Sequence, residues 1–173
     1  MMPGAKRFRI RWSFLGSLSI LCATPACAWD VGMPAAEVGA RVTAASTRIG
    51  EHVDWGAGTC GEPKYLKGTC VWELGSQLSL TANTIGPQSA ATMIVSRWSH
   101  FDMRDATTRK VFDQACRALV AALRPDWPAA KVAKFTSALI GPAKKDHEVK
   151  AEGIAFAFYT YPETLTCEAQ PAT

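Results

Sequence analysis

The chain has 173 residues, of which 48% are hydrophobic, and its 19 lysines and arginines outnumber its 15 acidic residues to give a net charge of +4. Four of the basic side chains and none of the acidic ones lie within residues 1–28, so residues 29–173 are neutral overall. A neutral chain gives no support to nucleic-acid binding, which needs a surplus of positive charge. Residues 29–173 have the usual size of one domain, with enough apolar side chains for a core.

Residues 1–28 are typical of a secretory signal peptide. A basic segment at residues 6–11 precedes an apolar run at residues 14–22, and Ala-Cys-Ala at residues 26–28 offers small side chains where signal peptidase requires them. We therefore predict cleavage after Ala28 and export to the bacterial periplasm or the cell exterior, with no transmembrane anchor in the mature chain. An uncleaved anchor is the alternative, but it would need about 20 apolar residues.

A helix and a three-strand meander are predicted for the first half of the remaining domain. Residues 34–50 begin with Pro and end with Gly, and their apolar side chains recur with the helical period at Val38, Val42, Ala45 and Ile49. Residues 69–74, 77–83 and 91–98 are rich in strand formers and are separated by turns that contain Gly. Such segments in close succession predict an antiparallel meander.

Two helices and a final pair of strands are predicted for the second half. Residues 105–124 have an apolar stripe and an N-terminal capping signal, and residues 129–140 form a second helix that Gly-Pro ends. Residues 154–159 and 165–167 form two strands joined by a turn. The predicted fold class is therefore α+β: an antiparallel sheet, made of a three-strand meander and a C-terminal hairpin, packed with an N-terminal helix and a helical hairpin.

Four cysteines remain after signal removal, and an even number in an exported chain indicates disulfides. Of the three possible pairings, we favour Cys60–Cys70 with Cys116–Cys167. The first bond closes a loop before the first strand. The second ties the apolar stripe of the middle helix to the last strand. A zinc site or a thioredoxin-like redox pair would need the spacing Cys-x-x-Cys, which the sequence lacks.

Two His-x-Asp pairs are the candidates for metal or acid–base chemistry. His52 with Asp54 forms the first pair, and His100 with Asp102 forms the second. On an extended segment residues i and i+2 point the same way, so each pair presents an imidazole and a carboxylate together. If the two segments converged, the four side chains would suit a metal-dependent hydrolase. Ordinary polar loop residues would show the same spacing, and we favour that interpretation and expect no cofactor.

Two aromatic residues of the cysteine-containing loop are the candidate binding residues. Trp55 and Tyr65 flank Cys60, and rings held on a bridged loop suit contact with a partner or ligand. Alternatively, these rings pack the loop against the sheet. The sequence as a whole predicts a non-enzymatic, exported domain that binds an unidentified protein or small molecule. A metal-dependent hydrolase and a structural component of the cell envelope are the alternatives.

Overall fold

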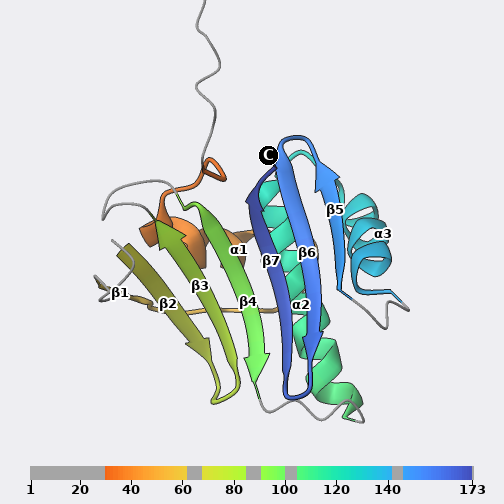
Figure 1. The fold of residues 1–173 in the computed structure, drawn as a ribbon, viewed down its shortest axis with the longest axis horizontal. Coiled ribbons are helices and arrows are strands. Elements are labelled where there is room, and N and C mark those ends of the chain that lie inside the picture. Colours follow the sequence, from red (N-terminus) through yellow and green to blue (C-terminus); the bar gives the residue numbers. More distant parts are fainter. Residues whose placement is uncertain (1–29, 62–67, 85–90, 100–104, 142–145, 173) are drawn as a thin grey trace, which may run out of the picture.

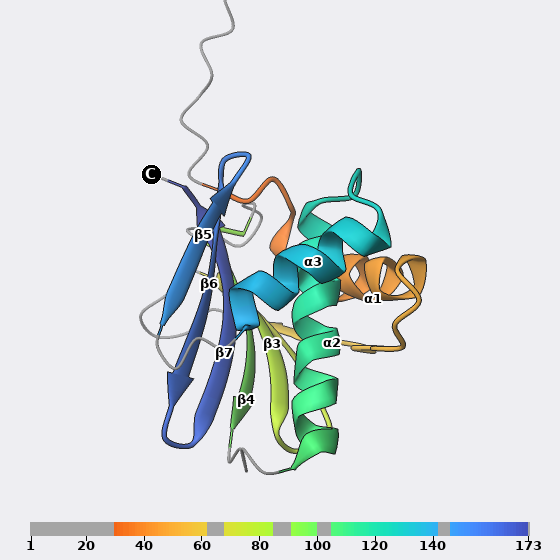
Figure 2. The ribbon, with the colours of Figure 1, turned by 90° about the vertical axis from the view of Figure 1, so that its right-hand side faces the viewer.

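The computed structural model describes residues 30–61, 68–84, 91–99, 105–141 and 146–172. These residues form two layers, a seven-stranded antiparallel sheet and three α-helices that lie on one face of it (Figures 1 and 2). No described helix lies on the opposite face. The predicted α+β class, with an N-terminal helix and a C-terminal hairpin, is therefore confirmed.

The sheet consists of two meanders that meet at their inner strands. The strands are β1 (Thr59–Gly61), β2 (Gly68–Leu74), β3 (Leu78–Thr84), β4 (Met93–Ser99), β5 (His147–Ala151), β6 (Ile154–Tyr161) and β7 (Thr164–Pro171). Their order across the sheet is β1-β2-β3-β4-β7-β6-β5, and all neighbours are antiparallel. After β4 the chain passes through the helical layer and enters β5 at the far edge of the sheet. It then returns through β6, and β7 pairs with β4. Strands from the two halves of the domain thus become neighbours.

The helices bury one side against the sheet and against one another. A short 3-10 helix, Ala35–Glu37, leads into α1 (Val38–Arg48), and α2 (Ala106–Leu123) and α3 (Ala129–Ile140) follow β4. The carboxylate of Asp105 caps α2 by accepting a hydrogen bond from the amide of Thr107 at 2.9 Å. Helix α2 packs against both other helices. It carries the predicted apolar stripe, whose buried residues are Phe112, Cys116, Leu119 and Leu123.

The core between the two layers contains a chain of aromatic rings. The ring of Phe158 on β6 lies 6.1 Å from that of Phe112 on α2, measured between centroids. The ring of Phe156 lies 5.2 Å from Phe135 on α3, which in turn lies 5.2 Å from Trp127. The last two contacts are edge-on, and an aromatic pair of this kind contributes about 0.5–1.5 kcal/mol beyond the burial of apolar area. These rings therefore join both α2 and α3 to the sheet.

Two glycines make room for the buried indole of Trp72 on β2. A Cβ at Gly39 of α1 would lie 2.2 Å from Nε1 of Trp72, and a Cβ at Gly58 would lie 2.1 Å from the same atom. Both distances are far below van der Waals contact, so a larger residue at either position would displace the ring. Close packing on Trp72 therefore offsets the cost of about 1 kcal/mol that a glycine imposes on the interior of a helix.

The structure adds two edge strands, β1 and β5, to the five that the sequence predicts. All three residues of β1 are exposed, and most of β5 is exposed too, with only Val149 and Ala151 partly buried against the core, so neither is a strong strand signal by itself. Strand β5 carries His147, Glu148 and Lys150, and charged side chains are common on edge strands because they discourage further pairing. Both segments are strands because the backbone of the neighbouring strand supplies their hydrogen bonds. The local sequence does not reveal this pairing.

The predicted disulfide between Cys60 and Cys70 is confirmed. The two residues face each other directly in the ladder of β1 and β2, with their Cα atoms 4.0 Å apart. Directly opposed residues of an antiparallel pair have the closest side chains. The bond therefore fastens the short strand β1 to β2.

The second predicted disulfide, Cys116–Cys167, is not formed in the structure, where both residues are completely buried free thiols. The two thiols are nevertheless close to each other, one on α2 and one on β7, because Cys167 contributes to the raised pKa of Cys116. A disulfide also requires a particular distance between the two residues and a particular torsion about the S–S bond. Burial of both cysteines in the same part of the core does not ensure this geometry. Burial, followed by the contact with Cys167, raises the pKa of the Cys116 thiol well above its usual range, which keeps it protonated and unreactive.

Titration of thiols distinguishes the two arrangements of Cys116 and Cys167. In exported protein that begins at Trp29, we expect no reaction of a thiol reagent with the native fold, because both thiols are buried. After denaturation without a reductant, both should react. A denatured chain with no reactive thiol would show that the bond predicted from the sequence exists. The linked peptide of Cys60 and Cys70 in a non-reducing digest is the internal control.

Candidate binding site

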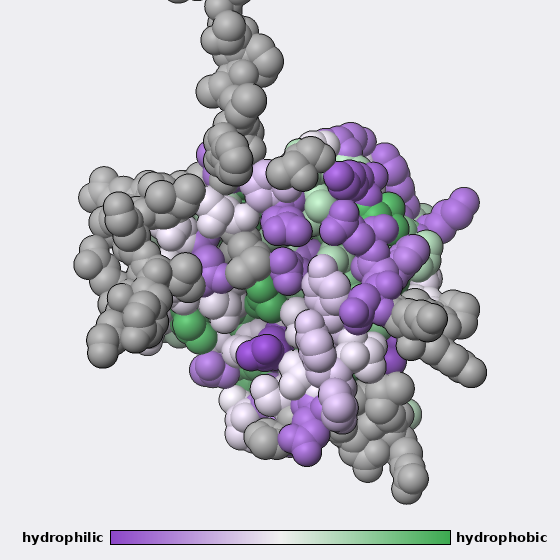
Figure 3. All heavy atoms as spheres, in the orientation of Figure 1, coloured by the Kyte–Doolittle hydropathy of each residue, from purple (hydrophilic) through white to green (hydrophobic). Residues whose placement is uncertain are grey.

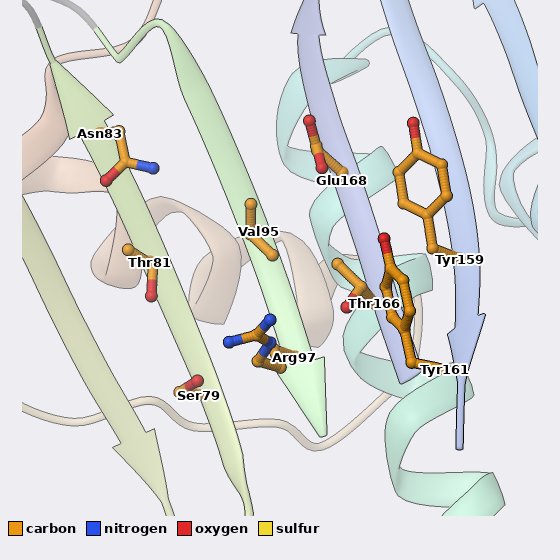
Figure 4. Close-up of a pocket in the computed structure, with 9 residues that line it drawn as sticks. All are labelled: Ser79, Thr81, Asn83, Val95, Arg97, Tyr159, Tyr161, Thr166 and Glu168. Atoms are coloured by element: carbon orange, nitrogen blue, oxygen red, sulfur yellow. The ribbon is translucent and has the colours of Figure 1, made fainter. Parts of the chain in front are cut away.

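The outward face of the sheet is hollowed across four strands. Side chains of a strand alternate between its two faces, and those of β3, β4, β7 and β6 that point away from the helices enclose a hollow of about 340 Å³ (Figure 4). Small-molecule sites commonly have volumes of about 300–1,000 Å³. We refer to this site as the sheet hollow. It is lined by Ser79, Thr81, Asn83, Val95, Arg97, Tyr159, Tyr161, Thr166 and Glu168.

The surface around the sheet hollow is mainly polar. In Figure 3, which shows this face, the spheres over the sheet are mostly white to purple, and the green ones form small separate patches. Short polar side chains line the β3 side of the hollow and two tyrosines line the β6 side, with Arg97 and Glu168 between them (Figure 4). Such a composition favours binding through hydrogen bonds, charge and ring stacking over burial of a large apolar area.

One row across the strands brings four hydrogen-bond donors together. Ser79 on β3 is opposite Arg97 on β4. Arg97 is in turn opposite Thr166 on β7, which is opposite Tyr159 on β6. Neighbouring strands lie about 4.7–4.9 Å apart, so the row spans the hollow. Two aliphatic hydroxyls, a guanidinium and a phenol can all donate hydrogen bonds, and the row therefore suits a ligand that carries oxygen acceptors.

Thr166 has a buried hydroxyl without a hydrogen-bond partner. Only 5% of the residue is exposed, and nothing in the described part of the chain bonds to its Oγ1. Leaving a polar group buried and unsatisfied costs about 1–3 kcal/mol, and most buried polar groups in native proteins are satisfied. Because Thr166 lines the sheet hollow, a ligand placed there would supply the missing hydrogen bond.

Arg97 presents an uncompensated positive charge to the sheet hollow. Its side chain is exposed and, among the residues that the structure describes, forms no ion pair or hydrogen bond. Four other arginines do pair with carboxylates: Arg41, Arg109, Arg117 and Arg124. A guanidinium offers a planar fork of donors that matches a carboxylate. The geometry of Arg97 is therefore suited to an anionic group of a ligand.

The side of the sheet hollow formed by β5, β6 and β7 is acidic. Burial, followed by the charge of Glu148, raises the pKa of Glu168. Burial also raises the pKa of Tyr159, followed by the effects of Glu168, Glu148, Tyr161 and Asp146. Desolvation and nearby like charges both disfavour an ionised acid. Acidic side chains therefore act on both Glu168 and Tyr159 from this part of the sheet.

Two tyrosine rings lie next to each other on β6. Tyr159 and Tyr161 point to the same face because they are two residues apart in a strand. Their ring centroids are 6.4 Å apart and their planes are inclined by 33°. Tyr161 is 51% exposed, which makes it stand out among the large hydrophobic side chains of the described residues. Accessible aromatic faces with polar tips are well suited to contact a ligand.

Of the two aromatic residues that the sequence suggests for binding, Trp55 does not contribute to this site. Trp55 is only 2% exposed, which corrects the prediction that its ring is available for contact. Its amide donates a hydrogen bond to Oγ1 of Thr43 at 3.1 Å and so ties the segment to α1. A large ring is most stable where it buries the most apolar area, so burial of Trp55 in the core is favoured over its exposure at the surface. Tyr65 lies outside the described residues.

Only the first His-x-Asp pair lies in the described part of the chain. His52 and Asp54 are exposed, and Oδ1 of Asp54 accepts a hydrogen bond from the amide of Gly56 at 2.9 Å, as in an ordinary turn. His100 and Asp102 lie outside the described residues, so convergence of the two pairs stays a prediction. Within the described ranges, no group of three or more His, Cys, Asp or Glu side chains could hold a metal ion.

Part of the signal for the sheet hollow is present in the sequence. Residues 154–161 alternate and end in Tyr-Thr-Tyr, so the tyrosines face outward if Phe156 and Phe158 face the core. The pairing of β4 with β7, which places Arg97 beside Thr166, has no such local signal. The sequence alone therefore does not reveal the site, because its members come from strands that only the fold brings together.

No protein-family model, curated protein or solved structure matches this chain. The function is therefore inferred from the geometry of the sheet hollow. It combines a concave polar face, an uncompensated guanidinium, a buried hydroxyl without a partner in the described chain and two adjacent rings.

Proposed function

We propose that the protein is an exported, non-enzymatic binding domain whose sheet hollow holds a small ligand. The observation that carries this proposal is the buried hydroxyl of Thr166, which has no partner in the described chain and belongs to a residue that lines the hollow. Arg97 and Tyr159 flank Thr166 in one row, so a single small molecule can contact all three. These groups are suited to hold a ligand by hydrogen bonds and stacking.

Two further observations support export as part of this proposal. The Cys60–Cys70 disulfide is a kind of bond that persists in oxidising compartments such as the periplasm. Residues 1–28, which lie outside the described part, have the pattern of a secretory signal. Among the described helices, none has both the length and the hydrophobicity needed to cross a bilayer. On the disulfide and the signal pattern, we therefore propose that the domain resides in the periplasm or outside the cell.

Nuclear magnetic resonance of the isotope-labelled exported protein tests the site. The small-molecule fraction of a bacterial cell extract is the probe, and ¹H–¹⁵N spectra are recorded with and without it. We expect shifts concentrated at the outward residues of β3, β4, β6 and β7. We also expect Thr166→Val to abolish most of these shifts, because the variant removes a hydroxyl that only a ligand would satisfy. The same substitution should leave the free energy of unfolding unchanged or raise it, since it removes an unsatisfied buried group.

Thr136→Val is the matched control for this experiment. Thr136 on α3 is 1% exposed and also has a hydroxyl without a partner among the described residues, but it lies in the helical layer, away from the hollow. Its valine variant should have the same effect on stability as Thr166→Val and no effect on the spectral shifts. Shifts that map to the helical layer, or that both variants reduce equally, would contradict a site in the sheet hollow.

A further inference from the structure

Opposite charges in the sheet hollow do not neutralise each other. Arg97 is paired with Thr166 in the strand register, and Glu168 lies two residues further along β7. Diagonal neighbours of this kind have Cα atoms about 7–8 Å apart. No ion pair joins Arg97 to Glu168 within the described chain, and burial, followed by the charge of Glu148, raises the pKa of Glu168. The hollow therefore keeps a positive and a negative end.

The negative end is formed by several groups that face the same space. Glu168 and Glu148 belong to one cross-strand row, with only the short side chain of Ala157 between them. Asp146 precedes β5, and it acts on Tyr159 together with both glutamates. Lys150 points to the same face of β5 from the next row, beside Ala155. Beyond burial, the charged groups that raise the pKa of the Tyr159 phenol are thus Glu168, Glu148 and Asp146, together with the Tyr161 phenol.

The tyrosine rings add a second attraction for positive charge at this end. An ammonium group over an aromatic face gains about 0.5–1 kcal/mol at an exposed site and more when it is desolvated. Tyr159 lies in the row of Arg97 and Thr166, next to the row of Glu168, and Tyr161 extends the aromatic surface by one more outward row, opposite Thr164. Figure 4 shows both phenol rings along one side of the hollow, with Glu168 and Arg97 across from them. Carboxylates and ring faces together make a site for an organic cation.

We infer that the ligand of the sheet hollow is dipolar: a carboxylate binds Arg97 and the Thr166 hydroxyl, and an ammonium group binds over Tyr159 beside Glu168 and Glu148. This inference rests on the proposed function and names the class of its ligand. The two charges of the ligand must be several ångströms apart, because the protein groups that they meet lie on diagonal positions of neighbouring strands. Amino acids whose amine is at the opposite end of the chain from the carboxylate have such a separation between the two charges, and so do short peptides. Glycine does not.

Three probes of equal chain length test the inference by calorimetric titration of the exported protein at low salt. The probes are 6-aminohexanoate, which carries both charges, hexylamine, which carries only the cation, and hexanoate, which carries only the anion. We expect 6-aminohexanoate to bind at least about tenfold more tightly than either single-charge probe, because each charged hydrogen bond contributes a factor of this size. Glycine, which is dipolar but short, should bind no better than the single-charge probes.

Charge-removing variants then assign each end of the hollow. Arg97→Gln should lose the preference for 6-aminohexanoate over hexylamine, and Glu168→Gln should lose the preference for 6-aminohexanoate over hexanoate. Arg41→Gln is the control, since Arg41 lies on α1 in the other layer and pairs with Glu37. It should keep both preferences. If Arg97→Gln and Glu168→Gln lost the same preference, or if the wild type bound all probes equally, the inference of a dipolar ligand would be wrong.

The extract experiment separates failure of the ligand class from failure of the site. If the extract shifts resonances in the sheet hollow but 6-aminohexanoate does not bind, the hollow is a binding site and its ligand is not dipolar. If neither the extract nor any probe perturbs the hollow, both the ligand class and the proposed function are wrong.

Discussion

Replacement of Phe156 by alanine is expected to lower the free energy of unfolding by about 3–5 kcal/mol, the usual cost of deleting a large buried ring. Phe156 is completely buried on the inner face of β6, and its ring meets that of Phe135 edge-on, at an interplanar angle of 75°. Phe135 makes the same kind of contact with Trp127. The substitution therefore removes apolar burial and also breaks the contact through which α3 is held on the sheet.

Urea unfolding followed by circular dichroism measures this loss, and Tyr161→Ala is the matched control. Tyr161 lies on the same strand but on the outward face, and it is 51% exposed. Its alanine variant should change the free energy of unfolding by less than about 1 kcal/mol, because little apolar area leaves the core. Equal losses in the two variants would mean that β6 does not present Phe156 inward and Tyr161 outward.

Removal of the disulfide in the double variant Cys60→Ser/Cys70→Ser is expected to lower the free energy of unfolding by about 2–3 kcal/mol. The bond closes a short loop, with a sequence separation of 10. Closing such a loop in the unfolded chain removes entropy that corresponds to an energy of this size. Strand β1 has only three residues, all exposed, so few other contacts hold it against β2 when the bond is absent.

Unfolding in the presence and absence of a reductant supplies the control for this second prediction. The reductant should destabilise the wild type by as much as the double substitution does, and it should leave the stability of the double variant unchanged. Hydrogen exchange should be faster at β1 and unaltered at β7, which lies three strands away from β2 in the sheet. If the reductant left the free energy of unfolding of the wild type unchanged, the bond would contribute nothing to stability.

Local patterns in the sequence predicted most of the elements. The apolar period of residues 34–50 became α1 with its preceding 3-10 helix, and the capping signal near residue 105 became the Asp105 cap of α2. The alternation of Phe156 and Phe158 with smaller residues predicted β6 and its inward face. The edge strands β1 and β5 escaped prediction because exposed strands need no apolar alternation and depend on a neighbour for their hydrogen bonds.

The sequence by itself determined which residues form helices and inner strands and which side of each is buried, and it favoured the pairing of Cys60 with Cys70. These properties follow from periodicity and from short separations along the chain, where few arrangements compete. Only the tertiary structure decided that β4 lies beside β7, that Trp55 is buried, that Cys116 and Cys167 meet as thiols, and that Arg97, Thr166 and Tyr159 share one row. The physical reason is that pairing of distant strands depends on how both faces of the whole sheet are packed, and one strand's residues do not encode its partner.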